Sequence, residues 1–88
     1  MDDELKRFLL DVSAEVGRAR EKFPETEGCM VALVEEVGEL ARAILDESPE
    51  RIRAEAVQVA CMAVRVVLDG DASLDHYRAK RGLGSFKK

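Results

Sequence analysis

Apolar side chains recur every three or four residues along most of this chain, which is the spacing of one face of an α-helix. The helices predicted from this spacing cover about residues 3–21, 26 or 27–46, 49–69 and 73–81. Residues 82–88, GLGSFKK, are expected to be irregular. The pattern therefore predicts an all-α fold.

Sequence signals at the helix ends predict how the helices are arranged. Ser48 followed by Pro49 indicates a helix start, because the serine side chain can cap free N–H groups and the proline ring is already fixed at a helical φ. Gly70 is expected to close that helix. The short break before Ser48 predicts an antiparallel hairpin, with the first helix packed beside it.

The third predicted helix, residues 49–69, is apolar around nearly its whole circumference. A helix of this kind is buried on more than one side. In a chain of 88 residues we expect the missing cover to come from further copies of the chain, as a homodimer or homotetramer that completes a four-helix-type bundle.

The composition supports a small helical protein of the cytoplasm. The chain is 47% hydrophobic but only 5% aromatic and has no Trp, so its core must be aliphatic. Cys29 and Cys61 form no disulfide framework, and Cys61 is expected to be a small core residue. No apolar run is long enough to span a membrane, and the first residues lack the pattern of a secretory signal.

Charge divides the chain into two parts. Residues 1–72 hold nine basic and seventeen acidic side chains, whereas residues 73–88 hold five basic and one acidic. We therefore expect a helical domain over 1–72 and a short helix with a basic tail over 73–88. An acidic domain argues against binding of duplex nucleic acid, which needs clustered cations, and is compatible with holding a divalent cation.

Four oxygen-bearing side chains are predicted to meet across the hairpin. Glu36 and Glu39 share a face at the edge of the apolar stripe of the second helix, while Glu55 lies inside the stripe of the third, with Gln58 one turn on. Glu39 and Glu55, and likewise Glu36 and Gln58, are symmetric about Glu47, where the helix break is predicted. The two pairs should therefore face each other at matched heights.

Converging carboxylates repel one another unless a cation joins them. Hard oxygen ligands without a nearby His or Cys favour Mg²⁺, with Mn²⁺ as the other candidate. A simpler interpretation is that the acids of the second helix are solvated and that Arg42 pairs with Glu39. Glu55 distinguishes the two interpretations, because a carboxylate in an apolar stripe needs a partner.

Two segments, LVEEVGELARAILDE at 33–47 and EAVQVACMAVRVV at 55–67, resemble the MazG-like all-α NTP pyrophosphohydrolases. The resemblance covers roughly residues 22–70 and implies a Mg²⁺-binding helical bundle completed by oligomerisation. It implies that Glu36, Glu39 and Glu55 are metal ligands and that Glu35 is the accompanying acid. Gln58 stands where the common family pattern has Asp, so it can still offer an oxygen ligand but adds no charge.

The resemblance further implies hydrolysis of a nucleoside triphosphate to the monophosphate and pyrophosphate, as in cleaning of the nucleotide pool. Magnesium would neutralise charge on the phosphate chain and lower the pKa of the attacking water, and Glu35 is the candidate that positions or deprotonates this water. The candidate substrate-binding residues are Lys22, Arg65, Lys80 and Arg81. The tail as a whole could contact substrate or stay solvated; its candidates are Arg78, Lys87 and Lys88 for phosphates and Tyr77 or Phe86 for the base.

Two other functions remain open from the sequence. The chain could be a catalytically weak or inactive helical module that binds a nucleotide or a partner protein, an alternative that depends on Gln58. It could also be a purely structural hairpin, provided that Glu55 is exposed or pairs with an arginine, for instance one of the first helix. His76, the only histidine, is expected to be a surface residue without a catalytic role.

Overall fold

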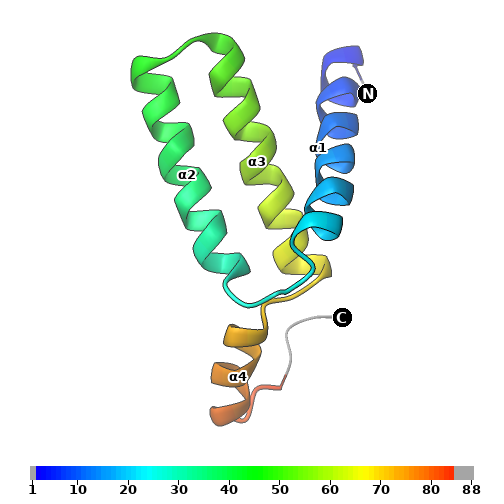
Figure 1. The fold of residues 1–88 in the computed structure, drawn as a ribbon, viewed down its shortest axis with the longest axis vertical. Helices are drawn as coiled ribbons and strands as arrows, with labels where there is room; N and C mark the ends of the chain where they lie inside the picture. Colours follow the sequence, from blue (N-terminus) through cyan, green and yellow to red (C-terminus); the bar gives the residue numbers. More distant parts are fainter. Residues whose placement is uncertain (1, 85–88) are drawn as a thin grey trace.

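Four α-helices and no strand make up residues 2–84, the part of the chain that the computed structural model describes. The helices are α1 (Asp3–Lys22), α2 (Cys29–Asp46), α3 (Pro49–Leu68) and α4 (Ala72–Lys80). Figure 1 shows α3 between α1 and α2, with α1 and α3 running in the same direction and α2 opposite to both. The predicted all-α fold with an antiparallel hairpin and a flanking N-terminal helix is confirmed.

The helices α1 and α3 begin where the sequence predicts, each with a side-chain cap. The carboxylate of Asp2 accepts a hydrogen bond from the Leu5 backbone N–H at 2.8 Å. The hydroxyl of Ser48 accepts one from the Arg51 N–H at 3.3 Å, with Pro49 in the first turn. These local bonds satisfy N–H groups that a helix leaves free at its start, so both ends can be inferred from sequence alone.

The predicted starts of α2 and α4 are wrong, and one residue explains both. The helix α2 begins at Cys29, after Gly28 in the left-handed conformation, and α4 begins at Ala72, one residue before the predicted start, with Asp71 as its cap. One Asp71 oxygen accepts from Ser73 and Leu74 N–H in α4 and from Gly28 N–H; the other accepts from Met30 N–H at 2.8 Å. Asp71 thus caps two helices that are distant in sequence.

The main apolar core lies between α1 and α3. Val12 and Val16 of α1 pack with Val57 and Cys61 of α3, and Cys61 is fully buried, as predicted. The opposite side of α3 packs against α2, where Ala43 is fully buried. Two sides of α3 are therefore covered within one chain, while Val67 and Leu68 near its end stay exposed, so the argument from α3 for a second copy applies only to that end.

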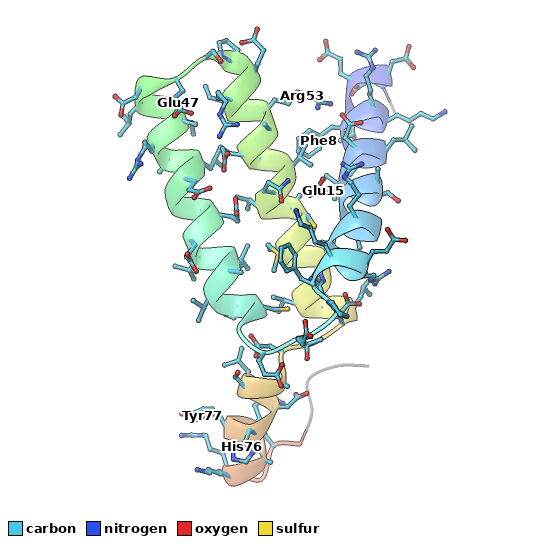
Figure 2. All side chains as sticks on the ribbon, viewed as in Figure 1. Phe8, Glu15, Glu47, Arg53, His76 and Tyr77 are labelled. Carbon is cyan, nitrogen blue, oxygen red and sulfur yellow. The ribbon has the colours of Figure 1, made fainter. Side chains whose placement is uncertain are left out.

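The helix α4 projects from the end of the bundle that lies opposite the α2–α3 turn (Figure 1). His76 and Tyr77 are exposed there, as Figure 2 shows, which agrees with the prediction for His76. No helix in the described residues is both long and apolar enough to cross a membrane. Phe86, Lys87 and Lys88 lie outside the described residues.

Candidate metal centre in the α2–α3 hairpin

The position of the candidate site follows from the tight connection between α2 and α3. Only Glu47 and Ser48 separate the two helices. The Glu47 N–H donates to the Ala43 carbonyl and ends α2, and the Ile52 N–H donates to the Ser48 carbonyl and begins α3. Because the connection is only two residues long, residues at similar distances from the turn lie opposite each other along the axis of the hairpin.

Three carboxylates meet across this hairpin. One oxygen from each of Glu36, Glu39 and Glu55 lies within 4.8 Å of the others. Glu55 is buried, Glu36 is half-buried and Glu39 is exposed, so the group opens from the helix interface toward solvent. The predicted meeting of the three acids is confirmed, while their role as metal ligands remains a prediction.

Two oxygens of this group are buried without a hydrogen-bond partner, namely Glu36 Oε2 and Glu55 Oε2. The other Glu55 oxygen, Oε1, accepts a bond from Arg51 Nη2 at 2.6 Å. Buried polar atoms are almost always paired, and an unpaired charged oxygen is especially unfavourable. A cation placed among the three carboxylates would satisfy both oxygens, so the residues present fit a divalent metal.

The pKa of Glu36 reflects the lack of a positive charge beside its carboxylate. Burial, together with the neighbouring carboxylates of Glu39 and Glu55, raises the pKa of Glu36 from its ordinary 4.5 to about 7. Without a metal, the group therefore relieves part of its repulsion by keeping a proton on Glu36 near neutral pH. A divalent cation and a proton are alternative ways to neutralise the same site.

Arg51 is a site residue that the sequence reasoning did not single out. Its Nε lies 3.4 Å from Glu47 Oε2, in addition to the contact with Glu55. These residues line a pocket of about 170 Å³ together with Glu39 and Arg42. The i,i+4 spacing of Arg51 and Glu55 was a signal for the pair, because such residues are neighbours on a helix. Glu55 therefore does pair with an arginine, which is the condition for a purely structural hairpin, although the arginine belongs to α3 and not to α1.

Gln58 contacts α1, which the hairpin geometry could not show. Its side chain hydrogen-bonds to Glu15, and this bond, followed by those with Arg18, lowers the pKa of Glu15. Glu15 points from α1 toward α3 in Figure 2. Because the Gln58 amide group donates to Glu15, its carbonyl oxygen remains available to another partner. Glu15 carries no apolar signal and could not be identified from sequence spacing.

The other predicted site residues lie elsewhere. Glu35 is exposed, and its carboxylate is outside the group of three. Lys22 Nζ lies 5.7 Å from the ring centroid of Phe23 at the end of α1. Neither residue lines the pocket between Glu39 and Glu55.

Arg65, Lys80 and Arg81 lie away from the candidate site within one chain, and their role as substrate contacts stays a prediction. Arg65 lies ten residues along α3 from Glu55, about 15 Å away along the axis, and its buried guanidinium binds Asp69 and the Phe23 carbonyl. The other two residues lie at the far end of α4, opposite the turn.

Comparisons of the chain with protein-family models, with curated proteins and with solved structures gave no match. The three carboxylates, two of which keep a buried oxygen without a partner, and the Arg51 guanidinium beside Glu55 form an acidic site. Such a site can bind a divalent cation, and its open side can admit a ligand that carries further oxygens.

Proposed function

We propose that this protein is a Mg²⁺-dependent nucleoside triphosphate pyrophosphohydrolase, related to the MazG-like enzymes and acting in cytoplasmic cleaning of the nucleotide pool. The observation that supports the proposal most strongly is the convergence of Glu36, Glu39 and Glu55 within 4.8 Å, with two buried oxygens that lack a partner. The sequence resemblance in residues 33–47 and 55–67 supplies the reaction class.

In this proposal the three carboxylates hold the metal, and Mn²⁺ can replace Mg²⁺. When bound, the cation supplies Lewis-acid stabilisation of the phosphate oxygens and lowers the pKa of water. Glu39 is the exposed member of the group, so the phosphate chain would enter on its side. Glu35 stays the proposed acceptor of the proton from water, although no contact among residues 2–84 ties it to the group.

Gln58 would act as a neutral oxygen ligand in place of the family's Asp. Its contact with Glu15 of α1 uses the amide N–H group, so the carbonyl oxygen would still be able to act as a ligand. With only three charged ligands the site binds its metal less tightly than a four-acid site.

The proposal is tested by a screen for pyrophosphate release from standard and modified nucleoside triphosphates with Mg²⁺. We expect at least one substrate to give the monophosphate and pyrophosphate in equal amounts, and Glu55→Gln to abolish this activity. Glu50→Gln is the matched control, because Glu50 is exposed in the first turn of α3. No release from any nucleotide by protein with bound metal would contradict the proposal.

The second candidate function is a weak or inactive helical module, and the Gln58–Glu15 contact is what favours it. In that case Gln58 serves the packing of α1 on α3 and contributes nothing to a metal. Metal binding without pyrophosphate release would be the result expected for such a module.

We also propose that the protein is a homodimer or homotetramer, on different grounds from those the sequence gave. Exposed apolar residues lie on several helices, and α2 carries a row of them: Met30, Val34, Val37 and Ile44. With Ala41 these positions alternate in steps of four and three, the spacing of a helix-to-helix seam. Gel filtration of Val37→Glu against the wild type tests this interface, and a wild-type monomer would contradict it.

A further inference from the structure

Arg51 occupies an unusual place beside the three carboxylates, because it is the cation that the buried Glu55 contacts. The Arg51 side chain is 57% exposed and that of Glu55 only 8%. An exposed group therefore neutralises a buried acid, and it does so at one oxygen only, since Glu55 Oε2 has no partner.

A second ion pair on the same helix shows what a permanent structural pair looks like. Arg65 is buried with its partner Asp69, and Asp69 also binds Arg20 of α1 through both carboxylate oxygens. That carboxylate is saturated by donors from two helices. The Arg51–Glu55 pair lacks both burial of the cation and saturation of the acid. Because Glu55 is buried, the pair can open readily only when another cation compensates that carboxylate.

Arg51 also lies at the boundary of the pocket through which a ligand would approach. Its guanidinium touches Glu47 at the turn and Glu55 at the base, and Arg42 lines the same pocket. Guanidinium groups bind phosphate oxygens with two parallel hydrogen bonds. An arginine released from Glu55 would thus stand beside the metal with donors suited to a phosphate chain.

We propose that Arg51 is an exchangeable cation: it neutralises Glu55 in the metal-free protein, is displaced from that carboxylate by the divalent metal, and then binds the phosphate chain of the substrate. This inference rests on the proposed function and adds to it a residue that binds substrate. It predicts two opposite effects of one side chain: Arg51 weakens binding of the metal and strengthens binding of the polyphosphate.

The first measurement is Mn²⁺ affinity without nucleotide, from the electron paramagnetic resonance signal of free Mn²⁺. We expect Arg51→Gln to bind Mn²⁺ about fivefold more tightly than the wild type, which corresponds to removal of one competing surface ion pair. Arg42→Gln controls for loss of a positive charge, because Arg42 lines the pocket without an ion pair to any residue within 2–84. Its effect should be less than twofold. Equal effects of the two variants, or an unchanged affinity in Arg51→Gln, would overturn the inference.

The second measurement is the affinity for inorganic tripolyphosphate at saturating Mn²⁺. Here we expect Arg51→Gln to bind about tenfold more weakly, as for loss of charge-assisted hydrogen bonds. Arg53→Gln is the matched control, because Arg53 pairs with Asp11 and faces Phe8 of α1, on another side of α3 (Figure 2). It should bind like the wild type, and an unchanged affinity in Arg51→Gln would overturn the assignment.

The two proposals can fail separately. If the wild type binds Mn²⁺ and releases pyrophosphate but Arg51→Gln matches it in both affinities, the role of Arg51 is wrong and the proposed function stands. If the wild type binds Mn²⁺ and the variants behave as expected but no nucleotide is hydrolysed, the role of Arg51 is supported and the proposed enzymatic function is wrong. If the wild type binds no Mn²⁺, both are wrong.

Discussion

Two buried carboxylate sites lie in the same small bundle, and their surroundings differ in one respect. Asp71, 1% exposed, receives hydrogen bonds on both oxygens from four backbone N–H groups. Glu36 and Glu55 each keep one buried oxygen with no partner. The first site is complete within the chain, and the second is incomplete without something from outside.

The pKa values of the two sites follow this difference. Burial raises the pKa of Asp71, but the backbone N–H groups outweigh it and hold the pKa below its ordinary value. At Glu36, burial acts together with like charges and the pKa rises to about 7. Burial of an acid is therefore not by itself a sign of function; the number of donors that meet the acid separates a structural carboxylate from a candidate ligand.

The largest effect is expected at Asp71. Asp71→Ala removes the cap of α2 and that of α4 and leaves several N–H groups unpaired, so we expect a loss of about 3 kcal/mol in the free energy of unfolding. Asp71→Asn keeps one acceptor oxygen and should lose less. Urea unfolding followed by circular dichroism measures both. A loss below about 0.5 kcal/mol in the alanine variant would show that the caps are not needed.

The three-acid group should respond to metal where Asp71 does not. At a metal concentration of about 100 times the dissociation constant, Mg²⁺ or Mn²⁺ should stabilise the wild type by about 2 to 3 kcal/mol. Glu55→Gln should abolish this gain, and Asp71→Asn should retain it. Thermal melts with and without metal decide the point, and a metal shift that survives in Glu55→Gln would contradict the assignment.

The two sites should also give stability opposite dependences on pH. In the folded, metal-free protein Glu36 keeps its proton up to about pH 7, whereas in the unfolded chain it ionises near its ordinary pKa of 4.5. The folded state therefore binds more protons between these values, and stability falls as the pH rises through this window. Asp71, with its pKa lowered, contributes stability that is lost only as the pH falls below about its ordinary 3.8.

Glu36→Gln should remove the first of these dependences. Urea unfolding in the presence of a chelator measures the free energy of unfolding at pH 5 and at pH 8. We expect the variant to lose less stability than the wild type when the pH rises from 5 to 8. Identical differences in wild type and variant would mean that Glu36 ionises normally.

The smallest effect is expected from Gln58→Asp, which introduces the acid that the MazG-like sequence pattern has at this position. It removes the hydrogen bond to Glu15 and places two carboxylates together, so the metal-free protein should lose about 1 kcal/mol of stability. Saturating Mg²⁺ should reverse the loss if position 58 contributes a ligand. A loss that metal leaves unchanged would assign Gln58 to the packing of α1 on α3.

The parts of this fold that local sequence could predict are those held by local contacts. Ser48 and Pro49 lie next to the N–H groups they affect, and the start of α3 was predicted to the residue. The start of α2 depends on Asp71, some forty residues away in the chain, and no local signal could reveal it.

The same reasoning applies to the candidate site. The proximity of Glu36, Glu39 and Glu55 could be predicted because a tight antiparallel hairpin places residues at equal distances from the turn opposite each other. The partners that come from outside this symmetry were missed: Glu15 belongs to α1, and the side chain of Arg51 had to be placed in space before its contact with Glu55 was evident.

Only Glu47 and Ser48 connect α2 to α3, and this length decides which side chains can share a ligand. One inserted residue would turn α3 by about 100° and move it by about 1.5 Å relative to α2 if the turn geometry were kept. Glu55 would then leave Glu36 and Glu39, although every acid would still be present in the sequence. Chains that share these acids but differ by one residue in the spacing between them are thus not expected to bring the three carboxylates together, so the length of this connection matters as much as the acids themselves.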